Sequence, residues 1–209
     1  MDTLIQGMPV TIKSLRNIIE KIISLSGDND PDFQLVDIEK IQEEKAYQGL
    51  RIRLNSQLGQ MKDSFHLDVV TGETLEQKAI RWKYQPLLED EKIPIYIYHP
   101  EQILAEKMQT ILQRGLANTR MKDFYDVYVT PITTDIDFET FSKDFKLVME
   151  ERKTVELWEF RKEILNMIIS DEKMNNEWLQ YAKTHGFVGD ISFENVTNSI
   201  TQLFNKIII

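Results

Sequence analysis

Residues 49–58, GLRIRLNSQL, alternate apolar and polar side chains, and this alternation decides the fold class. In an extended strand successive side chains point to opposite faces, so the leucines and the isoleucine share one face and the two arginines share the other. Segments 33–41 and 64–70 are also predicted strands, and only short turns separate the three. We therefore expect an antiparallel meander with one apolar face and one polar face.

The segments on either side of this meander complete the expected secondary structure. Apolar side chains at helical spacing predict a helix over 11–25, and strand-forming residues predict strands over 78–84 and 93–98. Helices are then expected at about 100–114, 120–129, 138–152, 156–170, 172–184 and 192–207. The order of elements predicts an α+β fold, with a mixed or antiparallel sheet domain over 1–99 and an all-helical domain over 100–209.

The composition narrows the class of protein. Hydrophobic residues make up 42% and charged residues 28% of the 209, and no apolar run approaches the roughly 20 residues that cross a bilayer. The first residues lack the basic and apolar regions of a secretory signal, and the chain has no cysteine, so we expect a cytoplasmic protein without disulfides. Three scattered histidines do not suggest zinc. Any metal would bind carboxylates, which favours Mg²⁺ or Mn²⁺.

The net charge of −9 disfavours non-specific binding to nucleic acid. A nucleotide or RNA partner would need a local basic surface. One candidate surface comprises Lys78, Arg81 and Lys83, and another comprises Lys107, Arg114, Arg120 and Lys122.

One carboxylate of the sheet half has an unusual position. Asp68 lies within the strand formers of residues 65–70, FHLDVV, where an acidic residue is disfavoured by propensity. It could be a solvent-facing residue on a half-exposed strand. Alternatively it could be a metal ligand, because a sheet holds a carboxylate rigidly enough for phosphoryl chemistry with two metals.

A second group of charges lies on two successive predicted helices. Its members are Glu106 and Lys107 on the first helix, and Arg120, Lys122, Asp123 and Asp126 at the start of the next. Asp123 and Asp126 are neighbours on one helix face and repel each other unless Lys107, Lys122, Arg120 or a metal lies between them. Each segment alone could also be an ordinary packing helix or a capped helix start. The run 150–153, EERK, is interpreted as a solvated helix face.

Several blocks together resemble a known family. They are residues 47–54 (YQGLRIRL), 65–69 (FHLDV) with Gly72 and Glu73, 101–107 (EQILAEK), Arg114 with Gly115, and 118–126 (NTRMKDFYD). In order and spacing they look like the AbiEii/AbiGii toxin family of nucleotidyltransferases, over roughly residues 1–130. The remaining residues resemble it only as a generic helical domain.

This resemblance implies a nucleotidyltransferase fold followed by a helical domain. It also implies the toxin of a toxin–antitoxin system linked to abortive phage infection. Such proteins bind a nucleoside triphosphate (NTP) with magnesium, and some transfer nucleotides to the acceptor end of tRNA. The implied partners are an NTP, tRNA or another RNA, and a cognate antitoxin, with no membrane.

The resemblance also implies roles for particular residues. Asp2 and Asp68 match metal-binding carboxylates. Asp68, Lys107, Asp123 and Asp126 are the expected catalytic residues, and Glu106, Arg120 and Lys122 are expected to bind the nucleotide. We expect these side chains to converge on one pocket that holds polyphosphate.

The sequence departs from the family pattern at its start. The Gly turn, the arginine and the first aspartate of the metal-binding strand do not precede Asp2, so we expect weak or no catalysis from these 209 residues alone. A start codon placed too late, a fragment and a decayed copy remain alternatives. Three functions therefore compete: a toxin-type enzyme, a non-catalytic relic that binds phosphate or RNA, and a structural or protein-interaction domain.

Overall fold

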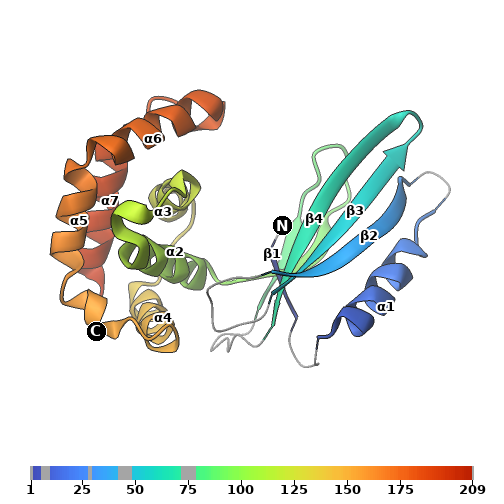
Figure 1. Cartoon of the computed structure of the whole chain (residues 1–209), viewed down its shortest axis with the longest axis horizontal. Coiled ribbons are helices and arrows are strands. Elements are labelled where there is room, and N and C mark those ends of the chain that lie inside the picture. Colours follow the sequence, from blue (N-terminus) through green and yellow to red (C-terminus); the bar gives the residue numbers. More distant parts are fainter. Residues whose placement is uncertain (1, 6–9, 28–29, 42–48, 72–78, 209) are drawn as a thin grey trace. The chain divides into compact units, whose positions relative to one another are not determined.

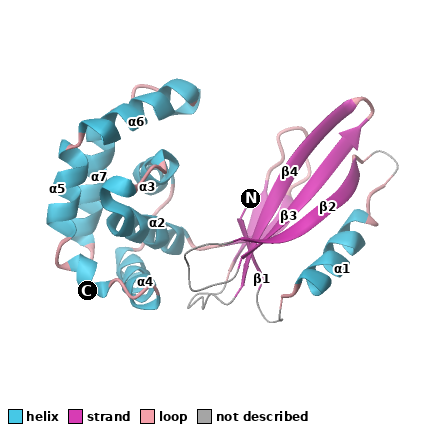
Figure 2. Cartoon of the chain, viewed as in Figure 1, coloured by secondary structure: helices cyan, strands magenta, loops and turns pink. Residues whose placement is uncertain are grey.

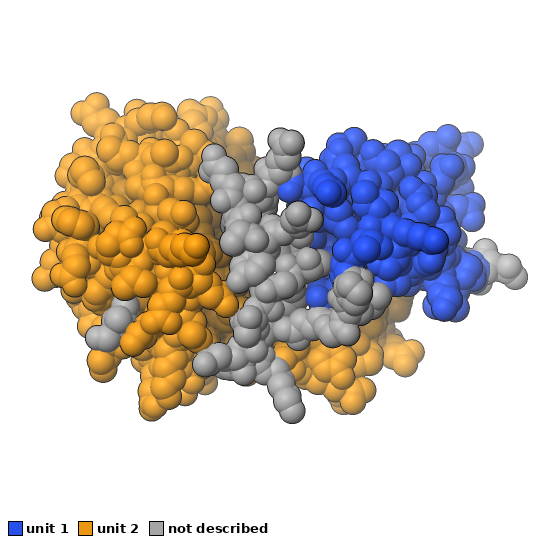
Figure 3. Space-filling view, turned by 60° about the horizontal axis from the view of Figure 1, so that its bottom comes forward, with its two compact units in different colours: residues 1–75 blue, residues 76–209 orange. Residues whose placement is uncertain are grey.

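The computed structural model describes residues 2–5, 10–27, 30–41, 49–71 and 79–208. The chain divides into two compact units, residues 1–75 (unit 1) and 76–209 (unit 2), which Figure 3 shows in different colours. Each unit has a hydrophobic core of its own. The α+β class expected from the sequence is confirmed.

Unit 1 is a four-stranded sheet with one helix (Figure 1). Its elements are β1 (Asp2–Ile5), α1 (Ile12–Ile23), β2 (Asp32–Ile41), β3 (Gly49–Leu58) and β4 (Met61–Thr71). The strand order is β1-β4-β3-β2, with β1 parallel to β4 and the other neighbours antiparallel. The predicted meander is therefore β2-β3-β4, and the parallel strand makes the sheet mixed.

Helix α1 packs on the apolar face of this sheet. Thr11 and Ser14 form a capping box that satisfies the first backbone N–H groups of the helix. Leu15 and Ile19 are buried against β-strand residues that include Ile52. The alternation of residues 49–58 thus turns the apolar face toward α1 and leaves the arginines on the opposite face.

The approximate alternation of β2 has a structural cause. The pairing with β3 shifts between Leu35 and Asp37, which marks a β-bulge. Because of this extra residue, both Leu35 and Ile38 pack in the core although they are three positions apart. Val36 is half exposed.

Unit 2 contains a hairpin and a helical bundle (Figure 2). Its elements are β5 (Ile80–Tyr84), β6 (Ile93–Ile97), α2 (Pro100–Arg114), α3 (Met121–Thr133), α4 (Phe138–Glu151), α5 (Arg161–Ser170), α6 (Glu172–Thr184) and α7 (Phe193–Lys206), with short 3₁₀ turns η1 (Gly115–Ala117), η2 (Val155–Trp158) and η3 (Gly186–Val188). The hairpin is grouped with the helices, and a domain boundary between residues 99 and 100 stays a prediction.

The core of unit 2 is rich in aromatic side chains. Phe124, Phe141, Phe145 and Trp178 are fully buried, and Phe145 packs at an edge-on angle against Phe204. One predicted helix, 156–170, is divided into η2 and α5. Within the described part of the chain, no helix is long and apolar enough to cross a bilayer.

Candidate functional site

Three charged residues of the sheet of unit 1, Arg51, Arg53 and Asp68, lie on the face opposite α1. Asp68 on β4 is the direct cross-strand partner of Arg51 on β3. The Nε and Nη2 groups of Arg51 each donate a hydrogen bond of 2.7 Å to a different carboxylate oxygen of Asp68. This two-pronged geometry is the strongest form of an arginine–carboxylate pair.

The Arg51 guanidinium keeps the Asp68 carboxylate ionised. Its hydrogen bond holds the pKa of Asp68 below the usual value of 3.8, although burial acts in the opposite direction. The side chain of Asp68 is 17% exposed and that of Arg51 is 35% exposed. Asp68 therefore lies with Arg51 on the polar face, but its side chain is mostly covered rather than solvent-facing.

The backbone register places a row of charged residues across the sheet. Asp2 on β1 pairs with Asp68, and Arg51 pairs on its other side with Glu39 on β2. The guanidinium of Arg53 lies 2.6 Å from Glu39 and 3.8 Å from Asp37. Arg51 and Arg53 thus form ion pairs with different carboxylates on the same face of the sheet.

The donor chemistry at Asp68 fits a hard divalent cation, which prefers carboxylate oxygens. Asp2 is a backbone neighbour, although its side chain lies outside what the structure describes. Among the described residues no group of three or more His, Asp or Glu side chains could hold a metal. Both oxygens of Asp68 accept hydrogen bonds from Arg51, so a cation there would compete with the guanidinium.

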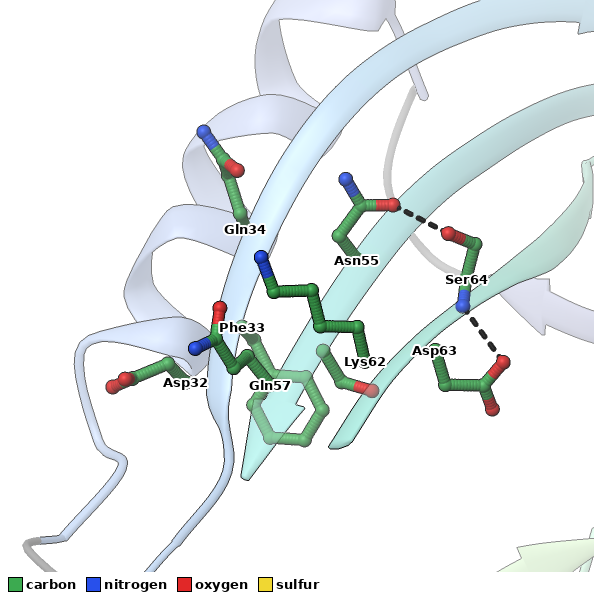
Figure 4. Close-up of a pocket in the computed structure, with 9 residues that line it drawn as sticks. Asp32, Phe33, Gln34, Asn55, Gln57, Lys62, Asp63 and Ser64 are labelled. Atoms are coloured by element: carbon green, nitrogen blue, oxygen red, sulfur yellow. Dashed lines mark hydrogen bonds between the residues drawn. The ribbon is translucent and has the colours of Figure 1, made fainter. Parts of the chain in front are cut away.

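A hollow of unit 1 lies further along the same polar face (Figure 4). Its polar lining includes Gln34 on β2, Asn55 on β3 and Lys62 on β4. The hydroxyl of Ser64 donates a hydrogen bond of 2.8 Å to Asn55 across its floor. These groups suit a polar ligand, but none of the predicted site residues lines this hollow.

In unit 2 a lysine lies between two aspartates. The Nζ atom of Lys107 on α2 is 2.9 Å from Asp123 Oδ1 and 2.7 Å from Asp126 Oδ2 on α3. The three side chains are 15–21% exposed. Lys107 is therefore the cation that the close spacing of Asp123 and Asp126 requires.

Packing of α2 on α3 brings these charges together. Leu104, Met108, Met121 and Phe124 are buried on the same helices, close in sequence to the charged residues. Between the helices, Gly115 has a φ of 49°, which glycine adopts without the strain that a Cβ would cause.

Lys107 remains protonated in this setting. Burial lowers its pKa, but the hydrogen bonds to Asp123 and Asp126 and the charges of these two residues together raise it more, so that the net pKa lies above the usual 10.5. The ammonium group is thus a permanent positive charge held at a defined position.

The other predicted binding residues of unit 2 differ in their surroundings. Lys122 is 71% exposed and lies 2.7 Å from Asp126, while Arg120 is the exposed residue that precedes α3. Glu106 points to a different partner, Arg152, at 3.4 Å. The structure thus joins Lys107, Lys122, Asp123 and Asp126 in one cluster.

Arg152 is a residue that the sequence analysis misjudged. It is 16% exposed and donates hydrogen bonds to the side chains of Glu106, Gln109 and Thr110 on α2. The interpretation of 150–153 as a solvated face is wrong at this residue, because the end of α4 brings the guanidinium onto α2. Nothing in the local charge pattern distinguishes Arg152 from a surface arginine.

Aromatic residues lie near the aspartates of unit 2. Tyr125 packs at an edge-on angle against Phe187, and Tyr181 stacks on His185 with ring centroids 4.3 Å apart. The Tyr181 hydroxyl is buried without a hydrogen-bond partner among the described residues. Burial, followed by the charge of Asp126, raises the pKa of this tyrosine.

The two groups of charges are described in different units, Arg51 and Asp68 in unit 1 and the Lys107 cluster in unit 2. Their convergence on one pocket stays a prediction. Lys78, Gly72 and Glu73 lie outside the described residues.

Comparison with known protein families identifies a match. The family model described as nucleotidyl transferase AbiEii toxin, type IV toxin–antitoxin system, matches residues 2–198. No curated protein and no solved structure gives a significant match. Because this match covers nearly all of the 209 residues, the chain belongs to the AbiEii nucleotidyl transferase toxin family.

Proposed function

We propose that this chain transfers a nucleotide from an NTP to RNA, with tRNA as the leading acceptor. It would act in the cytoplasm, where both substrates are found, as a toxin restrained by a cognate antitoxin. Family membership supports the nucleotidyltransferase and toxin roles. The observation that carries the proposal is the position of Lys107, a protonated lysine fixed by two carboxylates and still accessible to a ligand.

Lys107 is suited to bind a phosphate group. An ammonium group has three N–H donors, and Asp123 and Asp126 account for two of them. The third donor can reach a phosphate oxygen. Because the two aspartates fix the lysine before substrate binds, less conformational entropy is lost on binding.

The exposed cations at the start of α3 extend this cluster. Lys122 projects into solvent beside Asp126, and Arg120 precedes the helix. We infer that they attract the triphosphate or the RNA backbone. The affinity of the protein for these ligands should then fall as the salt concentration rises. This local surface would offset the overall charge of −9.

Asp68 is the proposed acidic partner in unit 1, with Asp2 as its neighbour on β1. Together they would hold Mg²⁺ or Mn²⁺, which would supply charge neutralisation of the polyphosphate and lower the pKa of an attacking hydroxyl. The proposed role of Asp68 is to bind the metal ion through its carboxylate oxygens, or to accept the proton of the attacking hydroxyl. The mostly covered position of its side chain would limit competition from water.

The test is transfer of radiolabel from each NTP to bulk tRNA by the full chain. We expect only weak labelling of the RNA with the wild type, in line with the weak catalysis expected from the sequence. Labelling should fall at least a further hundredfold with Asp68→Ala or Lys107→Ala, because removing one charge-stabilising group costs about 10²–10³ in rate. Lys143→Ala is the matched control, because Lys143 forms an exposed pair with Glu139 on α4. Equal labelling by wild type and Lys107→Ala would refute the role of the lysine.

One observation favours a second function, a non-catalytic module that binds phosphate or RNA. Both oxygens of Asp68 are engaged by Arg51, which is a complete ion pair without a metal. Under this alternative, NTP would bind in a manner that depends on Lys107, but no label would pass to any RNA. Equal NTP binding by wild type and Lys107→Ala would instead point to a purely structural domain.

A further inference from the structure

We propose that Arg51 is the resident counter-ion of Asp68, and that a divalent cation binds there only by displacing the guanidinium from the carboxylate. This inference rests on the proposed function, because it assumes that Asp68 binds the metal of a nucleotidyltransferase. It assigns to Arg51 a role as a positioning residue that controls metal affinity.

The geometry of the pair supports direct competition. Each carboxylate oxygen of Asp68 accepts a hydrogen bond of 2.7 Å from a different nitrogen of Arg51. A cation that bound the same oxygens would lie close to a permanent positive charge in a mostly covered environment, where the repulsion is only partly screened. At least one hydrogen bond must therefore break when the cation binds.

Arg51 can move without disturbing the core. Its backbone is held in the β2-β3-β4 ladder, and its side chain lies on the face opposite α1 and is 35% exposed. Glu39, whose carboxylate already binds Arg53 at 2.6 Å, is its backbone neighbour on β2, so a displaced guanidinium would share this carboxylate with Arg53. Exchange therefore requires a change of rotamer, not a change of fold.

Arg53 provides a matched control on the same strand and face. It lies two residues further along β3, where it pairs with Glu39 at 2.6 Å. Arg51→Gln and Arg53→Gln each remove one positive charge from this face. Only the first removes a hydrogen-bond donor from Asp68, so the difference between them isolates the direct effect.

The experiment measures Mn²⁺ binding to the full chain by calorimetry, with electron paramagnetic resonance of free Mn²⁺ as a second readout. We expect Arg51→Gln to bind about tenfold more tightly than wild type, which corresponds to about 1.4 kcal/mol. Arg53→Gln should stay within about twofold of wild type, since the more exposed charge is better screened by salt. Arg51→Lys, which keeps the charge but cannot bridge both oxygens, should lie between them.

The outcomes separate this inference from the proposed function. Circular dichroism first confirms that each variant is folded. If Asp68→Asn abolishes Mn²⁺ binding but Arg51→Gln binds no more tightly than Arg53→Gln, the inference fails and the metal role of Asp68 stands. Weaker binding by Arg51→Gln would also overturn it, because Arg51 would then support the metal site. If wild type and Arg51→Gln both show no binding that depends on Asp68, the metal role fails as well.

Discussion

Removing the charge of Lys107 should destabilise unit 2 strongly. Lys107→Met keeps the apolar part of the side chain but leaves Asp123 and Asp126 adjacent on α3 without the lysine. Breaking a buried ion pair costs about 3–5 kcal/mol, whereas an exposed pair contributes about 0–1 kcal/mol. The three side chains are only 15–21% exposed, so we expect a loss of about 2–3 kcal/mol in the free energy of unfolding.

Urea denaturation followed by tryptophan fluorescence measures this loss. All three tryptophans, Trp82, Trp158 and Trp178, belong to unit 2, so the signal reports on that unit. Lys143→Met is the control, because its exposed pair with Glu139 should contribute about 0.5 kcal/mol or less.

A triple variant tests whether the loss comes from unpaired carboxylates. Adding Asp123→Asn and Asp126→Asn to Lys107→Met removes the repulsion, so the triple variant should recover at least about 1 kcal/mol. If Lys107→Met is no less stable than Lys143→Met, or if the asparagines restore nothing, then the cluster does not stabilise the fold as argued.

Three further predictions concern other parts of the fold. Arg51→Gln should raise the pKa of Asp68, because the hydrogen bond from Arg51 holds this pKa below 3.8 in the folded wild type. The stability that the ion pair contributes to the fold is therefore present above about pH 3.8, and it is lost as the pH falls through the folded-state pKa of Asp68. Carboxylate titration by NMR checks this shift, and an unchanged pKa contradicts it. Leu15→Ala should cost about 2–5 kcal/mol in unit 1, seen as faster hydrogen exchange in β2–β4, whereas Ile22→Ala on the exposed side of α1 should cost much less. Ser192→Ala removes the capping box of α7 and should cost about 1 kcal/mol in urea denaturation, and a change below about 0.3 kcal/mol would count against a role for this cap.

Strict local patterns made most of the fold predictable from the sequence. The alternation of residues 49–58 identified both faces of β3, and helical spacing located α2 and α6 at their observed bounds. The bulge after Leu35 was not predictable, because one extra residue leaves no distinctive composition. The break before Arg161 was also missed. There the arginine donates a hydrogen bond to the carbonyl of Trp158, a contact that spacing does not reveal.

The candidate site was predictable only in part. Spacing showed that Asp123 and Asp126 need a cation, but several cations were available, and the packing of α2 on α3 selects Lys107. The pairing of Arg51 with Asp68 depends on the register of two strands. The hydrophobic pattern restricts this register but does not determine it. The partners of Arg152 are more than forty residues away in sequence, beyond the reach of any local pattern.

The parallel pairing of β1 with β4 has a consequence for the order of folding. The strands β2, β3 and β4 are joined by short connections and can pair early, whereas β1 must close a loop of about sixty residues to reach β4. The entropy lost in closing a loop grows with its length, so we expect β1 to dock last. Asp2 and Asp68 would then become backbone neighbours only when folding is nearly complete, so the proposed metal-binding pair would be the last part of unit 1 to assemble.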